Sequence, residues 1–171
     1  DVNPGEAARS LPSSAIEDRA LAREPVRASL VLLKNDNGVL PLARGGRVLV
    51  VGRGADSYPM QSGGWSRTWQ GTENVREDYG TGQTLLEAVR ETLGADAVTY
   101  SETGAGVDVS QFSAVVAVLG EEPYAEGRGD VSYPASLAHT ARYPQDLATL
   151  RAVSGRGVPV VTVLYSGRTV Y

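Results

Sequence analysis

Four carboxylates lie close together in residues 120–130 (GEEPYAEGRGD): Glu121, Glu122, Glu126 and Asp130. Paired carboxyl groups can carry out general acid/base chemistry when burial or a neighbouring carboxylate raises the pKa of one of them. The apolar run 114–119 directly precedes this segment. A buried strand that breaks at a glycine into such a loop is where an open α/β sheet places a polar site.

Both tryptophans of the chain lie in a second glycine-bounded stretch, residues 63–71 (GGWSRTWQG). Exposed indoles at Trp65 and Trp69 would offer flat apolar faces that stack on a sugar ring. Neighbouring polar groups, here Arg67 and Gln70, would bind its hydroxyls. The residue types favour equally well a second interpretation, in which the two indoles are core anchors that pin a long loop.

The surrounding elements alternate between strands and helices. Apolar runs predict strands at 47–52, 98–100, 114–119 and 158–165, and helical spacing predicts helices at 84–93 and 145–153. The alternation predicts an α/β fold, a mostly parallel sheet with helices on both faces. The carboxyl ends of its strands would present the loops 52–79, 120–143 and 166 onward at one edge of the sheet.

The N-terminal part of the chain is more irregular. We expect residues 1–14 to form a linker or extended arm, and residues 15–171 to form one α/β body. Ser13 or Ser14 could cap a helix that Pro25 would kink or divide. A further short strand is expected at 30–33, closed by a turn at 35–38.

Composition argues against several classes of protein. The net charge is −4 and the basic residues are scattered, which disfavours nucleic acid or an anionic membrane as a partner. The chain has no cysteine and one histidine, His139, so a thiolate or histidine metal centre and a Ser-His-Asp triad are not expected. No apolar run reaches the roughly 18 residues of a membrane span, and no signal-peptide pattern is present.

A nucleotide cofactor is also not expected. Gly52 and Gly54 follow a strand, but the dinucleotide fingerprint needs a third glycine where Ser57 stands. The residues after it do not have the pattern of an opening helix. The glycines are better explained by a tight turn after the strand.

Several motifs together resemble one known family, the C-terminal α/β-sandwich domain of family 3 glycoside hydrolases, which are β-glucosidases and exo-β-glucanases. The resemblance covers about residues 20–170, and GGWSRTWQG and GEEPYAEGRGD are its most specific parts. The other matching segments are RASLVLLKND (27–36), the following LPL (40–42), the strand at 48–52, TGQTLLEAV (81–89) and VLYSGR (163–168). Thr169 stands where the family commonly has proline.

The resemblance implies roles for three residues. Glu126, the glutamate of the PYxE portion, would be the general acid/base of a retaining mechanism. Trp69 would stack on the sugar next beyond the scissile bond, and Trp65 would support that loop. An acid needs a raised pKa, to which Glu121, Glu122 and Asp130 could contribute. For Glu121 and Glu122 themselves a structural or hydrogen-bonding role is expected, and Tyr124 could pack the loop.

The family's nucleophile is an aspartate in a preceding (β/α)8 barrel of roughly 250 residues, which a chain of 171 residues cannot contain. We therefore expect the acid/base half of an exo-acting β-glucosidase or glucan glucohydrolase that releases glucose from the nonreducing ends of β-glucans. The expected partners are a β-linked gluco-oligosaccharide and the missing barrel. The domain is expected to be truncated at its C-terminal end, inactive alone, and periplasmic or secreted. The alternative is a non-catalytic carbohydrate-binding or interaction module.

Overall fold

The computed structural model describes residues 19–132 and 134–171. These described residues fall into two compact units, the first ending at Pro41 and the second running from Leu42 to Tyr171. In the first unit, helix α3 (Arg19–Ser29) contains Pro25 and is not divided there. The proposed caps at Ser13 and Ser14 lie outside the described residues. The expected turn is present as a short 3₁₀ segment, η1 (Asp36–Gly38), in which Asn37 has a φ of 59°.

The strand expected at residues 30–33 is not formed, so that prediction is wrong. This stretch is irregular and its side chains are largely exposed, with Leu33 at 83%. An apolar run becomes a strand only when a neighbouring strand satisfies its backbone groups. None of the described residues pairs with residues 30–33 in a sheet.

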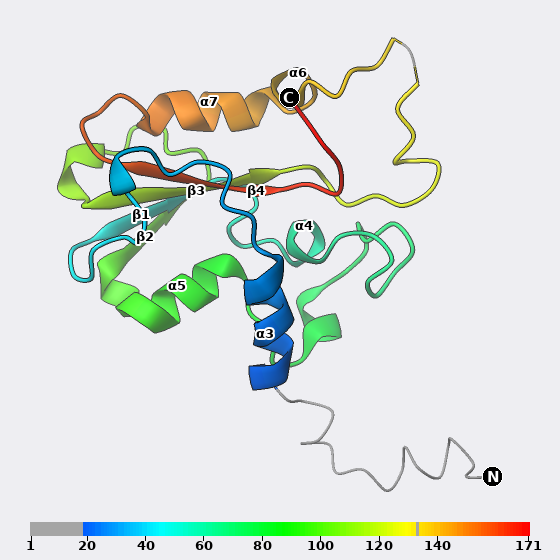
Figure 1. The fold of residues 1–171 in the computed structure, drawn as a ribbon, viewed down its shortest axis with the longest axis horizontal. Coiled ribbons are helices and arrows are strands. Elements are labelled where there is room, and N and C mark those ends of the chain that lie inside the picture. The colour runs from blue at the N-terminus through cyan, green and yellow to red at the C-terminus, as the bar shows by residue number, and fades with distance from the viewer. Residues whose placement is uncertain (1–18, 133) are drawn as a thin grey trace, which may run out of the picture. The chain divides into compact units, whose positions relative to one another are not determined.

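The second unit is built on a four-stranded sheet in which every pair of neighbouring strands is parallel, in the order β2-β1-β3-β4 (Figure 1). The strands are β1 (Val48–Val51), β2 (Val98–Ser101), β3 (Ala114–Gly120) and β4 (Val160–Tyr165). All four were expected from the sequence. Strands β1 and β3 are buried along their whole length, as continuous apolar runs at the centre of a parallel sheet should be.

Helices cover both faces of this sheet, which confirms the α/β sandwich (Figure 1). Successive strand residues point to opposite faces, so the core falls into two clusters. One cluster packs Leu86 of α5 (Leu85–Leu93) against Val50 and Val118, and the other packs Val153 of α7 (Pro144–Val153) against Val51.

Helix α5 begins where the sequence indicates. Thr84 accepts a hydrogen bond from the backbone N–H of Glu87 at 3.3 Å, and the Glu87 carboxylate accepts one from the backbone N–H of Thr84 at 2.9 Å. This reciprocal capping box satisfies two backbone donors that a helix start otherwise leaves free. Gly94 ends the helix with a φ of 88°.

Two short helices were not predicted. Helix α4 (Tyr58–Ser62) follows Gly54, so the expectation that no helix opens there is wrong. Ser57 caps it, and Pro59 stands in its first turn. Helix α6 (His139–Arg142) precedes α7. The remaining 3₁₀ segments are η2 (Arg76–Tyr79), η3 (Ala95–Ala97) and η4 (Val109–Gln111).

Candidate functional site at the carboxyl edge of the sheet

The tryptophan loop (residues 63–71) and the acidic loop (residues 120–130) touch each other through their backbones. A Cβ added to Gly64 would lie 2.1 Å from the carbonyl oxygen of Tyr124. One added to Gly71 would lie 2.9 Å from Cβ of Pro123. No real Cβ makes contacts this short, so glycine at these positions is what allows the two loops to meet.

This contact brings the three sequence-predicted site residues together. The Glu126 carboxylate accepts a hydrogen bond from Nε1 of Trp69 at 2.7 Å and bonds from Nε1 of Trp65 at 3.0 and 3.1 Å. The two indole rings are 6.4 Å apart between centroids and tilted by 50°. Trp65 is 70% exposed and Trp69 56% exposed, so the interpretation of both as core anchors is wrong.

The same hydrogen bonds decide the direction of the Glu126 pKa shift. The indole N–H of Trp69, with smaller help from that of Trp65, stabilises the ionised carboxylate and holds the pKa of Glu126 below its usual value. The expected rise is therefore not present in this chain. The pKa of Glu126 does not rise because the indole donors favour the ionised carboxylate, and because its exposure to water leaves little burial to oppose them.

An open hollow of about 380 Å³ lies beside Glu126. Its lining includes Trp65, Tyr124, Asp130 and Arg168. The volume falls at the lower end of the range for small-molecule sites, roughly 300–1,000 Å³. The hollow therefore places an apolar ring, two carboxylates and a guanidinium around one space, which suits a polyhydroxylated ligand.

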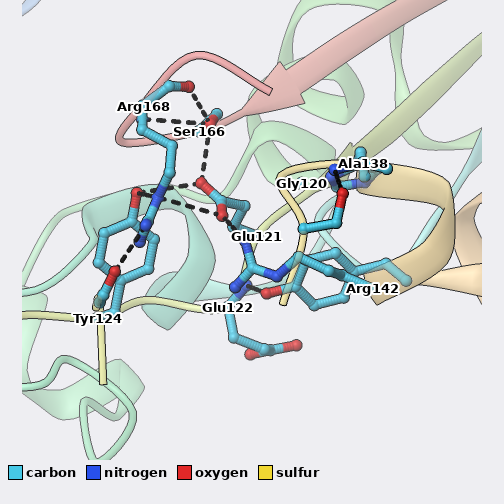
Figure 2. A network of polar contacts seen from close by, with 12 residues as sticks. Gly120, Glu121, Glu122, Tyr124, Ala138, Arg142, Ser166 and Arg168 are labelled. Atoms are coloured by element: carbon cyan, nitrogen blue, oxygen red, sulfur yellow. Dashed lines mark hydrogen bonds and ion pairs between the residues drawn. The ribbon is translucent and has the colours of Figure 1, made fainter. Parts of the chain in front are cut away.

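Glu121, by contrast, is buried at 3% exposure and fully engaged (Figure 2). Its carboxylate accepts bonds from Arg142 at 2.5 Å, Ser166 at 2.9 Å and Tyr124 at 3.0 Å. Burial alone raises the pKa of Glu121, but the hydrogen bonds from Ser166, Tyr124 and Arg142 outweigh it and leave the pKa lowered. Glu121 thus holds the acidic loop, as expected, and its lowered pKa keeps the carboxylate ionised near neutral pH.

Arg168 ties the far end of the acidic loop to the end of β4. Its Nε donates to the Tyr124 hydroxyl at 2.6 Å (Figure 2). Its Nη1 donates to the Gly129 carbonyl at 2.6 Å. Its guanidinium also lies 3.8 Å from the centroid of the Tyr124 ring. Tyr124 therefore packs the loop, as expected from the sequence.

Arg53 fills the place where a doubly wound sheet binds its ligands. This place is the switch point between β1 and β3, whose connections lead to β2 and β4 on opposite sides. Arg53 Nε donates to Asp146 at 2.9 Å, and its other nitrogens donate to the Gly120 carbonyl and the Glu122 carboxylate. Arg53 and its partners thus lie in this crevice, and Glu122 has the hydrogen-bonding role expected of it, here to Arg53.

Asp146 completes this second network from helix α7. It is 2% exposed, accepts from the backbone N–H of Gly120 at 3.2 Å, and lies 2.8 Å from Nε2 of His139. Over residues 19–132 and 134–171 there is no cluster of three or more histidine, aspartate and glutamate side chains placed to hold a metal ion. The same residues contain no helix that is both long and apolar enough to cross a bilayer.

Sequence reasoning missed the part that Gln70 plays. It was expected to face a sugar, but its side-chain amide is bound to the protein. Its Nε2 donates to the Glu126 carbonyl at 2.9 Å and its Oε1 accepts from the backbone N–H of Ala125 at 2.8 Å. The only signal in the sequence was its place between Trp69 and Gly71, which does not distinguish these two roles.

Comparison with known proteins gives one consistent result. Residues 30–171 match the family model of the glycosyl hydrolase family 3 C-terminal domain. The chain is 33% identical to a lysosomal β-glucosidase of Dictyostelium discoideum, over 90% of this chain and 20% of that protein. It is 30% identical to a periplasmic β-glucosidase of Salmonella typhimurium (strain LT2), over 88% of this chain and 22% of that protein.

Among solved structures, an exo-1,3/1,4-β-glucanase from a Pseudoalteromonas species is similar, with a TM-score of 0.80 and 39% identity. The match covers 90% of this chain and 19% of that one. The chain thus spans about a fifth of the length of the curated relatives it matches. These relatives are glycoside hydrolases of which this domain is a part, and the chain belongs to the glycosyl hydrolase family 3 C-terminal domain family.

Proposed function

We propose that this chain supplies Glu126 as the general acid/base of a retaining, exo-acting β-glucosidase or glucan glucohydrolase. The substrate is a β-linked gluco-oligosaccharide from which glucose is released at the nonreducing end. The observation that supports this most directly is the exposed Glu126 carboxylate, held between the indoles of Trp65 and Trp69 at the edge of an open hollow.

The residue types fit the two steps of retaining hydrolysis. Glu126 first donates a proton to the leaving glycosidic oxygen and then removes one from the attacking water. The nucleophile, a second carboxylate about 5 to 5.5 Å away, would come from the aspartate of a (β/α)8 barrel in the same protein. Trp69 would stack on the sugar beyond the scissile bond, and Trp65 would support its loop.

The lowered pKa of Glu126 is consistent with a role that begins only in the assembled site. A proton donor must be protonated, and the indole donors favour the ionised form. A nucleophile carboxylate nearby, and a barrel that covers Glu126, would both raise its pKa. The chain alone lacks these partners, so we expect it not to hydrolyse glycosides by itself.

The test is kinetic and uses the full-length protein that carries this chain. In Glu126→Gln, kcat/KM for natural oligosaccharides should fall by about 10² to 10⁴, the usual contribution of a general acid. For an aryl glucoside with a strongly acidic leaving group it should change little, because such a group departs without a proton. Glu77→Gln, at an exposed glutamate outside the site, is the matched control. Equal losses on both substrates would contradict the acid role.

A second candidate is favoured by the exposure of the two indoles on the chain itself. A carbohydrate-binding module would present the same platform without catalysis. Calorimetry of the 171-residue chain with laminari- and cello-oligosaccharides separates the two. A module binds measurably alone, whereas half of an active site does not.

Compartments outside the cytosol are supported by the relatives named periplasmic and lysosomal.

A further inference from the structure

Gln70 joins the tryptophan loop to the acidic loop through both atoms of its amide. One bond ends on the backbone N–H of Ala125 and the other on the carbonyl of Glu126. These two groups flank the peptide that links Ala125 to Glu126. The amide therefore fixes the backbone of Glu126 on both sides of that peptide.

The residue before it, Trp69, binds the other end of Glu126. Its Nε1 donates to the carboxylate at 2.7 Å. Two successive residues of the tryptophan loop thus hold the acidic residue at its side chain and at its backbone. The bonds from Trp69 and Gln70 to Glu126 are 2.7 and 2.9 Å long, so neither can lengthen much without being lost. A shift of one loop therefore moves the other.

Burial shows that Gln70 does not bind a sugar itself. The residue is 9% exposed, and both polar atoms of its amide are occupied by backbone groups. The tryptophan loop is also held by hydrogen bonds to a buried asparagine. Asn74, at 4% exposure, accepts hydrogen bonds from the backbone N–H and the hydroxyl of Thr68 at 3.0 and 2.8 Å.

We propose that Gln70 is a positioning residue for proton transfer: it sets the distance between Glu126 and a sugar stacked on Trp69. The inference rests on the proposed function, because it assigns to Gln70 a part in the reaction of Glu126. It acts through the backbone of Glu126 and touches no reacting atom. Loss of the Gln70 amide should therefore slow only the steps in which Glu126 transfers a proton.

The experiment uses the full-length protein with Gln70→Met, which keeps the length of the side chain and removes both hydrogen bonds. Gln145→Met, at an exposed glutamine of α7, is the matched control. We measure kcat/KM for aryl β-glucosides whose leaving groups increase in basicity, with the melting temperature of each variant. A displaced acid should cost about 10- to 100-fold with the most basic leaving group and less than about 3-fold with dinitrophenolate.

A structural role alone predicts another pattern, since a smaller folded fraction lowers the rate equally for every leaving group. An equal loss, or none, with Gln70→Met would overturn the proposal. If Gln70→Met fails to fold, Gln70→Glu keeps the acceptor for Ala125 and loses the donor to Glu126. It should then show a smaller version of the same dependence on leaving group, and a flat profile would overturn the proposal.

Glu126→Gln is measured in parallel so that two failures can be told apart. A steep dependence on leaving group with Glu126→Gln and a flat one with Gln70→Met refutes only the positioning role. A flat profile with Glu126→Gln refutes the proposed function and the positioning role together. A steep profile with both variants, and none with Gln145→Met, supports the positioning role.

Discussion

Replacing Glu121 by glutamine should destabilise the fold at neutral pH and much less in acid. Hydrogen bonds from Arg142, Ser166 and Tyr124 converge on its two buried oxygens, and glutamine offers one acceptor and one donor in their place. Whichever way the new amide turns, its NH₂ group must face a donor. At least one cationic or hydroxyl partner therefore loses its acceptor.

The size of the effect follows from burial. Removing one partner of a fully buried ion pair costs about 3–5 kcal/mol. Arg142 keeps 27% of its side chain exposed, and Arg168, whose Nε lies 3.5 Å from the Glu121 carboxylate, keeps 20% exposed. Water therefore partly solvates both guanidinium groups. We therefore expect a loss of about 2–4 kcal/mol in the free energy of unfolding, since amide hydrogen bonds replace part of the pair. That loss corresponds to a urea midpoint lower by about 1–2 M.

The pH dependence provides the sharper test. The pKa of Glu121 is lower in the folded chain than in the unfolded chain, so its ionised carboxylate stabilises the fold above the unfolded pKa. That contribution is lost as the pH falls through the folded pKa. The difference between wild type and Glu121→Gln should thus begin to narrow below about pH 4.3.

Urea unfolding followed by circular dichroism from pH 7 to acid measures both quantities. Glu102→Gln, at an exposed glutamate that directly follows β2, is the matched control and should leave the midpoint unchanged. Equal midpoints for wild type and Glu121→Gln at pH 7 would refute the assigned role. A difference that stays constant on acidification would refute the argument from ionisation.

Two further changes test the loop contact and the capping of α5. In Gly64→Ala the new methyl group would collide with the Tyr124 carbonyl, so the two loops must separate. Both tryptophans lie in the tryptophan loop, so their fluorescence should change, and an unaltered spectrum would contradict the contact. Thr84→Ala removes a fully buried helix cap whose hydroxyl also donates to Asp56 at 2.8 Å. The substitution should lower the free energy of unfolding by about 1–2 kcal/mol, measured by thermal denaturation. An unchanged melting temperature would refute this capping role.

Local patterns were enough to predict most of the fold. The continuous apolar runs of β1 and β3 and the Thr84–Glu87 capping box are signals contained in a few neighbouring residues. The strand expected at 30–33 failed because a strand depends on a partner that the run itself does not specify. Helix α4 was missed because five residues are too few to show a helical period.

The site was predictable in its chemical groups but not in its connections. Glu126, Trp65 and Trp69 were found because they belong to recognisable motifs. The partners of Arg53 were not found, because its ion pair with Asp146 joins residues 93 positions apart. The direction of the Glu126 pKa shift depended on where two indole N–H groups point, which no sequence pattern states.

The central claim is that Glu126 acts as the acid/base, and azide tests it most directly. In Glu126→Ala of the full-length protein, a substrate with a good leaving group still forms the glycosyl-enzyme, but no base activates water. Azide needs no base, so it should attack the anomeric carbon, displace the nucleophile carboxylate, restore turnover and give β-glucosyl azide. Turnover that azide leaves unchanged, with glucose as the sole product, would contradict the claim.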